Sequence, residues 1–394
     1  MPPFTGGLGR ARGLLAERFG HAAFRVHQLR VLGPLLAGRS ILAVLPTGAG
    51  KSLCYQLPAL MARGLTLVVS PLISLMQDQV AALRRRGIPA AYLNSLLTPD
   101  ERRAVLDAAL SGSLALLYCA PERLGSLVRQ LSRAGREVSL LAVDEAHCIV
   151  EWGNEFRPVY RKLDRYRYLL LGDPVTIALT GSATPGTRNE ILHVLRIPQA
   201  EVVVTSFDRP NLVFRVERVR DDRERFTRVR ELIRVDGPVV LYTPTRRLTE
   251  LVTRALLRMG VRAAPYHAGL TAGTRRRVLR AFLADRAPVV VATSAFGMGI
   301  DKPDVRRVLH WGPPRTVEAY YQEAGRAGRD GRRSECVVVW RPADFAWGDA
   351  ATEVRRYVET RTCRRAALLA YFGERGTACS GCDVCGVERW RPSS

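Results

Sequence analysis

Eight consecutive residues near the start of the chain have the types and order that bind a phosphate group. The stretch Leu45–Ser52 reads Leu-Pro-Thr-Gly-Ala-Gly-Lys-Ser, between the apolar run Ile41–Leu45 and the helical pattern Leu53–Met61. Glycines let the backbone approach an anion, and N–H groups at a helix N-terminus point toward it. The consensus for such a loop has glycine where this chain has Leu45. An ordinary strand–turn–helix corner is the alternative interpretation.

Lysine is rare in this chain, which makes the lysine of this loop informative. Of the 60 basic residues only Lys51, Lys162 and Lys302 are lysine. A compact ammonium suits phosphate oxygens where a forked guanidinium does not. We expect Lys51 to contact the terminal phosphates of a nucleotide and the Ser52 hydroxyl to hold Mg²⁺. Thr47, Gly48 and Gly50 complete the nucleotide-binding set predicted from this loop.

An acidic motif follows a second apolar run. Asp144-Glu145-Ala146-His147 comes directly after Leu140–Val143. A carboxylate at the end of a buried strand is well placed to hold Mg²⁺ through water, and Glu145 can polarise an attacking water. Solvated turn residues are the alternative. The phosphate-loop pattern roughly ninety residues upstream favours the catalytic interpretation of Asp144 and Glu145.

Two arginines near the end of the second half could also act on a phosphate. Arg326 and Arg329 stand three apart in Gln322–Arg329, so they share one face if the segment is helical. Guanidinium groups delivered across an interdomain cleft can stabilise charge on a transferred phosphoryl group. A solvated basic helix face is the alternative, and the spacing does not decide between the two.

Eight cysteines fall into two groups. Cys363, Cys379, Cys382 and Cys385 are separated by 15, 2 and 2 residues. Four thiolates at such spacing suit a closed tetrahedral Zn²⁺ site that contributes folding energy. Disulfides are the alternative, which a reducing cytosol and the lack of a secretory signal disfavour. The other four lie in apolar contexts and are predicted to be small core residues: Cys54, Cys119, Cys148 and Cys336.

Apolar strand-like runs alternate with helical patterns along the chain, which predicts two parallel α/β sheets with ligand sites at the strand C-termini. The first six runs are Ile41–Leu45, Thr66–Ser70, Leu114–Cys119, Leu140–Val143, Thr176–Leu179 and Val202–Thr205. The second six are Val213–Val216, Val239–Tyr242, Ala263–Tyr266, Val289–Thr293, Val308–Trp311 and Cys336–Trp340. A polar, proline-containing break at Ser206–Asn211 places the expected domains at 1–205, 206–340 and 341–394, the last helical and cysteine-rich.

Composition narrows the class of partner. The net charge of +23 over 394 residues predicts a polyanionic partner. A GC-rich genome explains arginine over lysine but not the excess of basic residues. No apolar stretch approaches the roughly 20 residues that span a bilayer, so we expect a cytoplasmic, nucleoid-associated protein and no membrane contact. The Arg-rich N-terminus resembles a transit peptide, but Leu14–Phe19 already reads as an amphipathic helix of the fold.

Taken together, these motifs resemble superfamily 2 helicases, and the chain is similar to the RecQ family of DNA helicases over nearly its whole length. The strings that carry the resemblance, beyond those above, are 24–28, 46–58, 69–76, 120–124, 148–158, 266–270, 295–303 and 320–331.

The resemblance implies an ATP-dependent enzyme with two RecA-like lobes that clamp ATP and move 3′→5′ along single-stranded DNA, in repair or recombination. ATP, Mg²⁺ and Zn²⁺ are the implied cofactors, and single-stranded, tailed and forked DNA the implied partners; protein partners are not identified. Gln28 and Arg25 would recognise adenine, with His21 stacking on it, and Asp301 would belong to the ATP site. An aromatic-rich loop would couple DNA binding to hydrolysis through Trp152, Phe156 and Arg157.

The distance from the last cysteine to the end of the sequence raises an alternative function. Nine residues follow Cys385, so the resemblance implies a short form without the winged-helix and helical accessory domains. A DNA-stimulated ATPase that remodels or anneals strands with little unwinding is therefore the second hypothesis. An RNA helicase is the third, because Asp144–His147 is a box shared with that group.

Overall fold

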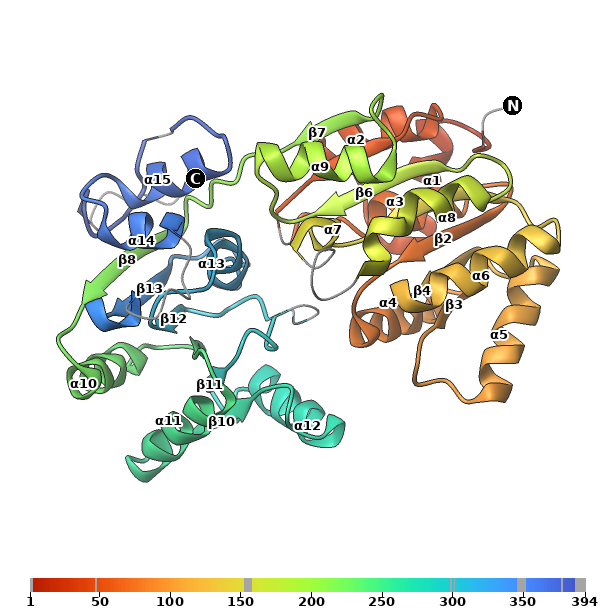
Figure 1. Ribbon diagram of the computed structural model, residues 1–394. Coiled ribbons are helices and arrows are strands. Elements are labelled where there is room, and N and C mark those ends of the chain that lie inside the picture. The colour runs from red at the N-terminus through yellow and green to blue at the C-terminus, as the bar shows by residue number, and fades with distance from the viewer. Residues whose placement is uncertain are drawn as a thin grey trace. The chain divides into compact units, whose positions relative to one another are not determined.

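The computed structural model describes residues 3–46, 48–151, 158–297, 300, 302–345, 352–376 and 378–386. The chain divides into two compact units, Met1–Ser206 and Phe207–Ser394, each with its own parallel sheet and flanking helices (Figure 1). Within the described ranges, no helix combines the length and apolar character needed to cross a membrane. The predicted pair of parallel α/β sheets is confirmed.

The first unit is built on a seven-stranded parallel sheet with the order β3-β4-β2-β5-β6-β1-β7. Most of its strands are buried along their whole length, as expected where helices cover both faces of a parallel sheet. The strands are β1 (Ile41–Val44), β2 (Leu65–Val69), β3 (Ala90–Leu93), β4 (Leu116–Cys119), β5 (Val138–Val143), β6 (Val175–Thr180) and β7 (Glu201–Val204). All were predicted except β3.

The helices of this unit follow the strands in the order expected for parallel crossovers. Their bounds are α1 (Leu8–Phe19), α2 (Val26–Leu36), α3 (Leu53–Ala59), α4 (Ile73–Arg85), α5 (Pro99–Ser111), α6 (Pro121–Arg133), α7 (Cys148–Glu151), the 3₁₀ helix η1 (Pro158–Lys162), α8 (Leu163–Leu169) and α9 (Pro185–Leu195). Cys54, Cys119 and Cys148 are fully buried, which confirms their prediction as core residues.

The second unit carries a six-stranded parallel sheet with the order β10-β11-β9-β12-β13-β8. All six strands were predicted, and Cys336 on β13 is buried as expected. The strands are β8 (Leu212–Arg218), β9 (Val239–Tyr242), β10 (Ala263–Tyr266), β11 (Val289–Ala292), β12 (Arg307–Trp311) and β13 (Ser334–Trp340). Its helical elements are α10 (Asp222–Ile233), α11 (Arg246–Arg258), α12 (Ala272–Leu283), α13 (Val317–Ala324), η2 (Pro342–Phe345), α14 (Thr352–Glu359) and α15 (Arg364–Tyr371).

The C-terminal segment joins this second unit through the edge strand β8 and one buried arginine. Arg365 on α15 is 1% exposed and donates to the carboxylate of Asp208 and to the carbonyls of Arg209 and Leu212. Its guanidinium also lies over the ring of Phe214, 5.3 Å from the centroid. A buried cation held by this many acceptors ties α15 to the start of the sheet.

The outer edge of β8 is covered by the loop that contains the last cysteines. The backbone N–H of Phe214 donates to the carbonyl of Gly381 (3.4 Å), and the N–H of Asp383 donates to the carbonyl of Phe214 (3.0 Å). The carboxylate of Asp383 accepts the N–H of Val216 (3.1 Å). Backbone groups at the open edge of the sheet therefore have partners within the chain.

Candidate nucleotide-binding site and zinc centre

Three loops meet at the carboxyl edge of the first sheet. Strand β6 lies between β5 and β1, and neighbouring strands are about 4.8 Å apart, so the loops after β5 and β1 begin about 10 Å from each other. Asp144 follows β5, Ser182 follows β6 and the loop 45–52 follows β1. The carboxyl edge of a parallel sheet is where ligands bind in this class of fold.

The loop after β1 has the backbone geometry that its glycines predict. Gly48 and Gly50 have φ angles of +83° and +77°, in the left-handed region that other residues rarely adopt. A Cβ atom at Gly50 would lie 2.6 Å from Nε2 of Gln28, so a side chain there would clash. Leu45, which replaces the consensus glycine, is fully buried and its N–H extends the pairing with Thr180 of β6.

Three of the side chains predicted to bind nucleotide make hydrogen bonds within or to this loop. Arg25 donates to the carbonyl of Gly48 (2.6 Å), and Gln28 accepts the N–H of Arg25 (2.9 Å) and donates to the carbonyl of Gly50 (3.4 Å). Nζ of Lys51 donates to the carbonyl of Leu45 (3.2 Å). His21 is exposed and forms no hydrogen bond to the described residues of the loop.

The acidic pair after β5 combines a buried carboxylate with a more exposed one. Asp144 is 5% exposed, and burial together with the charge of Glu145 raises its pKa to about 7, although Lys51 acts in the opposite direction. Glu145 has a φ of +50°, a conformation uncommon outside glycine that persists where function requires it. Carboxylate and hydroxyl oxygens are ligands that Mg²⁺ accepts, so Asp144 and Ser52 have the donor atoms that would hold this ion.

A buried histidine links this acidic pair to the loop after β6. Nδ1 of His147 lies 3.5 Å from the carboxylate of Glu145 and 2.9 Å from the hydroxyl of Thr180. That hydroxyl also contacts the backbone of Ser182, as acceptor from its N–H (3.3 Å) and donor to its carbonyl (3.0 Å). The sequence assigned no role to His147 or Thr180, because nothing in one-dimensional spacing pairs residues this far apart.

In the second unit, Arg326 and Arg329 lie beyond the helix that was considered for them. Helix α13 ends at Ala324, and the arginines occupy the turns that follow. Arg326 is 9% exposed, and its Nε has no hydrogen-bond partner among the described residues. Arg329 donates to the carbonyl of Ile300 (2.9 Å). Because both guanidinium groups are partly or wholly enclosed, the solvated-face alternative does not describe them.

The backbone of these turns is held by two residues of the segment that was predicted as an interdomain break. Arg209 donates to the carbonyls of Ala327 and Gly328 (both 3.0 Å), and Asn211 donates to the carbonyl of Gly328 (2.8 Å). Gly328 has a φ of +54°, and a Cβ there would lie 2.5 Å from the Asn211 amide. The segment 206–211, predicted as an interdomain break, therefore also positions the arginine-bearing turns.

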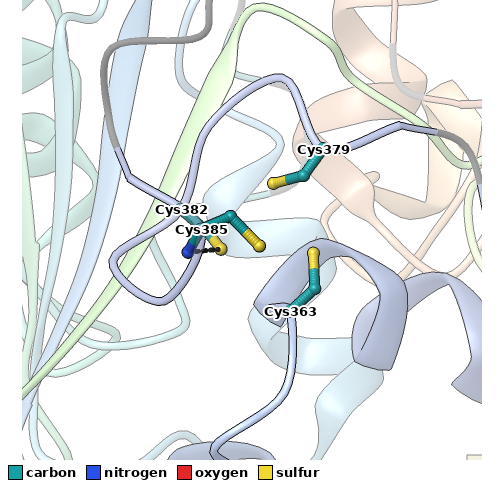
Figure 2. Close-up of side chains that lie close together, drawn as sticks. All are labelled: Cys363, Cys379, Cys382 and Cys385. Carbon is teal, nitrogen blue, oxygen red and sulfur yellow. Dashed lines mark hydrogen bonds between the residues drawn. The ribbon is translucent and has the colours of Figure 1, made fainter.

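The four C-terminal cysteines form a metal-binding cluster. Cys363 begins α15 and the other three lie on the loop that follows it, with all four sulfurs pointing toward one another (Figure 2). Their sulfur atoms all lie within 4.8 Å of one another. Tetrahedral Zn²⁺ with bonds of about 2.3 Å places sulfurs about 3.8 Å apart, so the cluster fits this ion.

Backbone donors prepare two of these sulfurs for a metal. The N–H of Ala366 lies 3.5 Å from Sγ of Cys363, and the N–H of Cys385 lies 3.3 Å from Sγ of Cys382. Burial works against the thiolate of Cys382, yet hydrogen bonds from the backbone of Cys385 and Arg364 lower its pKa to about 7. The predicted zinc site is thus confirmed as a four-cysteine cluster.

Five of the predicted site residues lie outside the residues that the structure describes. They are Thr47, Trp152, Phe156, Arg157 and Asp301.

Two parallel α/β units with a phosphate-binding loop, an acidic pair and a zinc cluster define a helicase-type P-loop protein. Three family descriptions match successive parts of the chain: DEAD/DEAH box helicase at 25–191, helicase conserved C-terminal domain at 224–331 and RecQ zinc-binding at 349–386.

Whole-chain relatives identify the family. The chain is 41% identical to ATP-dependent DNA helicase RecQ of Haemophilus influenzae, over 95% of this chain and 63% of that protein. It is 42% identical to RecQ of Bacillus subtilis, over 96% of this chain and 67% of that protein. The chain belongs to the RecQ family, and it spans less than two thirds of the Haemophilus relative.

Solved structures support the fold alone. Mycobacterium smegmatis helicase Lhr bound to single-stranded DNA and AMP-PNP is similar with a TM-score of 0.66 and 23% identity, over 92% of this chain and 54% of that one. Saccharomyces cerevisiae Dbp5 bound to RNA and ADP BeF₃ has a TM-score of 0.69 and 16% identity, over 94% and 95% of the two chains.

Proposed function

We propose that the protein is an ATP-dependent DNA helicase that moves 3′→5′ along single-stranded DNA and opens tailed or forked duplexes. The observation that carries this proposal is the convergence of Lys51, Asp144 and Glu145 at the carboxyl edge of one sheet, in a chain that belongs to the RecQ family. The boundaries 1–205, 206–340 and 341–394 remain our proposal for its three domains.

Each residue of the site has a definite task in ATP hydrolysis. Lys51 donates to phosphate oxygens, and the loop N–H groups bind the same anion. Glu145 orients the attacking water and accepts its proton, while His147 fixes the direction of the Glu145 carboxylate. Mg²⁺ held by Ser52 and Asp144 would neutralise phosphate charge.

The remaining roles fall to two arginines of the second unit, to the aromatic-rich segment near Trp152 and to the adenine-binding residues. Arg326 and Arg329 stabilise charge on the transferred phosphoryl group in the manner of arginine fingers. Trp152, Phe156 and Arg157 contact unpaired bases, since aromatic and guanidinium planes stack on any base. Arg25 and Gln28 read adenine, with His21 stacking on the base and with Thr47 and Asp301 as further nucleotide contacts.

The test compares two of the three lysines of this chain, one in the phosphate-binding loop and one exposed. Lys51→Ala should abolish ATP hydrolysis and retain binding to single-stranded DNA, whereas Lys162→Ala, an exposed lysine on η1, should retain both. Each variant is assayed for ATPase activity with DNA and with RNA, and for separation of duplexes with a 3′ or a 5′ tail. Undiminished hydrolysis by Lys51→Ala would contradict the phosphate-loop assignment.

The same assays distinguish the alternatives. Hydrolysis stimulated by DNA without strand separation would identify a remodelling or annealing ATPase. Stimulation by RNA in preference to DNA would identify an RNA helicase.

A further inference from the structure

An arginine-lined cavity in the second unit lies apart from the residues assigned to ATP. Its volume is about 550 Å³, and it is lined by Arg218 at the end of β8, Trp340 at the end of β13, and Arg355, Arg361 and Arg364 from α14 and the residues after it. The size falls within the roughly 300–1,000 Å³ of ligand sites. We call this feature the arginine cavity.

The charge of the arginine cavity is strongly positive and only partly neutralised. Among the described residues that line it, Glu359 is the one carboxylate, and it pairs with Arg355 (3.2 Å). Arg218 and Arg361 are exposed, and no carboxylate in the described part of the chain pairs with either guanidinium. Guanidinium forks without a carboxylate partner match the oxygens of a phosphate group.

Arg364 neutralises the partial negative charge at the C-terminal end of α14, which would otherwise repel an anion. Its guanidinium donates to the carbonyls of Tyr357 (2.6 Å) and Val358 (3.3 Å), the last turn of that helix, and pairs with Asp383 (3.0 Å). Carbonyls at a helix C-terminus would otherwise present partial negative charge to the cavity. The side chain is 6% exposed, so this wall is fixed by buried contacts.

An aromatic wall accompanies the arginines. The guanidinium of Arg218 lies over the ring of Trp340, 5.8 Å from its centroid, and Trp340 meets Phe345 edge to face at 5.5 Å. Arg355 in turn lies over Phe345 at 5.7 Å. Alternating arginine and aromatic planes are the surface on which a nucleic-acid strand rests without sequence preference.

The arginine cavity lies at the carboxyl ends of β8 and β13, on the same side of the sheet as the loops that follow β10 and β11. All strands of this sheet are parallel, so the ends of β8 and β13 face the same way as the end of β10. Five strand steps of about 4.8 Å separate β10 from β8, a reach of about 24 Å. A nucleic-acid strand that lies along these strand ends and starts near β10 would reach the cavity only if it were long enough.

We propose that the arginine cavity binds the phosphodiester backbone of a nucleic-acid strand, as an outlying contact on the second unit. The inference rests on the proposed DNA-binding function. It adds a site on the second unit that a long DNA strand would reach. The recognised chemistry is a phosphate group, and a free phosphate anion is the other source that the experiment must separate.

The test compares two double variants with equal loss of charge. Arg218→Gln/Arg361→Gln removes the two uncompensated arginines of the cavity. The control Arg234→Gln/Arg258→Gln removes two exposed arginines at the ends of α10 and α11, on the opposite edge of the sheet. Circular dichroism and zinc content check the folding of both.

The readout is binding of labelled thymidine strands across a salt series. For a strand of about 30 nucleotides, the cavity variant should lose roughly 25-fold in affinity at about 0.1 M salt, with a log–log salt slope shallower by about 1.4, since each single-strand phosphate contributes about 0.7. For a strand of about 10 nucleotides, within one site, cavity and control variants should match.

Two results would contradict the inference while the proposed function stands, and a third would contradict the proposed function itself. Equal binding by both variants to the long strand refutes the cavity contact while the proposed function stands. Binding of inorganic phosphate by the wild type but not by the cavity variant, with equal DNA binding, assigns the cavity to a free anion instead. A wild type that binds no DNA refutes the proposed function itself.

Discussion

Replacing Arg365 with methionine should destabilise the second unit more than any exposed arginine replacement could. The guanidinium is 1% exposed and serves one carboxylate and two carbonyls. Removing one partner of a buried ion pair costs about 3–5 kcal/mol, and replacing Arg365 also takes a hydrogen-bond donor from the carbonyls of Arg209 and Leu212. Methionine keeps an unbranched apolar stem in place of that of arginine, so most of the loss reflects the guanidinium and its hydrogen bonds.

The expected effect on melting follows from the size of the unit. The second unit spans Phe207–Ser394, and each kcal/mol shifts the midpoint of a domain of 150–250 residues by about 2–4 °C. Arg365→Met should therefore lower the midpoint by about 6–20 °C. Arg356→Met on α14, an exposed position, should change it by no more than about 2 °C.

The assay follows zinc release on heating, with a dye that changes colour when it chelates the ion. Cys363 stands two residues before Arg365, so unfolding around this helix frees the metal. A double variant with Asp208→Asn should lose less stability than the sum of the two single changes, because both single changes remove the same Arg365–Asp208 ion pair. Equal midpoints for Arg365→Met and Arg356→Met would refute the argument.

Three further outcomes are expected. Asp144→Asn should stabilise the nucleotide-free protein by an amount that grows between about pH 4 and pH 7 and then levels off at about a few kcal/mol. Burial and the charge of Glu145 raise the Asp144 pKa, so this carboxyl contributes stability at low pH that is lost as pH rises; chemical unfolding at several pH values measures this. Arg326→Gln should lower kcat for ATP by about 10³–10⁵-fold with a much smaller change in KM, whereas Arg332→Gln should not, and a loss confined to KM would refute the finger role. Cys379→Ser should lose zinc and become protease-sensitive while Cys379→His retains the metal, as metal analysis and limited proteolysis would show; a soluble, zinc-free, protease-resistant Cys379→Ser would contradict this.

Most of the sheet architecture could be predicted because buried parallel strands leave long apolar runs. The exception, β3, reads Ala-Ala-Tyr-Leu, and two alanines give neither the hydrophobic run nor the β-branched residues that mark a strand. The pattern of four cysteines was equally direct, since metal geometry fixes close spacing in the sequence.

What the sequence could not provide were contacts between distant residues. Arg209 and Asn211 looked like parts of a polar break, yet their side chains hold turns more than a hundred residues away. The same holds for His147, which follows β5, because its partner Thr180 lies at the end of β6. Hydrogen bonds of this kind depend on which strands become neighbours, and local pattern carries no record of that order.

The loop that carries Gly381 and Asp383 has a consequence for behaviour in solution. By pairing with Phe214 and Val216, it closes the outer edge of a six-stranded sheet against other molecules. Exposed strand edges are templates on which a second chain can add. Zinc in the adjoining cysteine cluster therefore protects more than the local fold: a chelator would uncover β8 and leave a strand edge on which further copies of the chain can add.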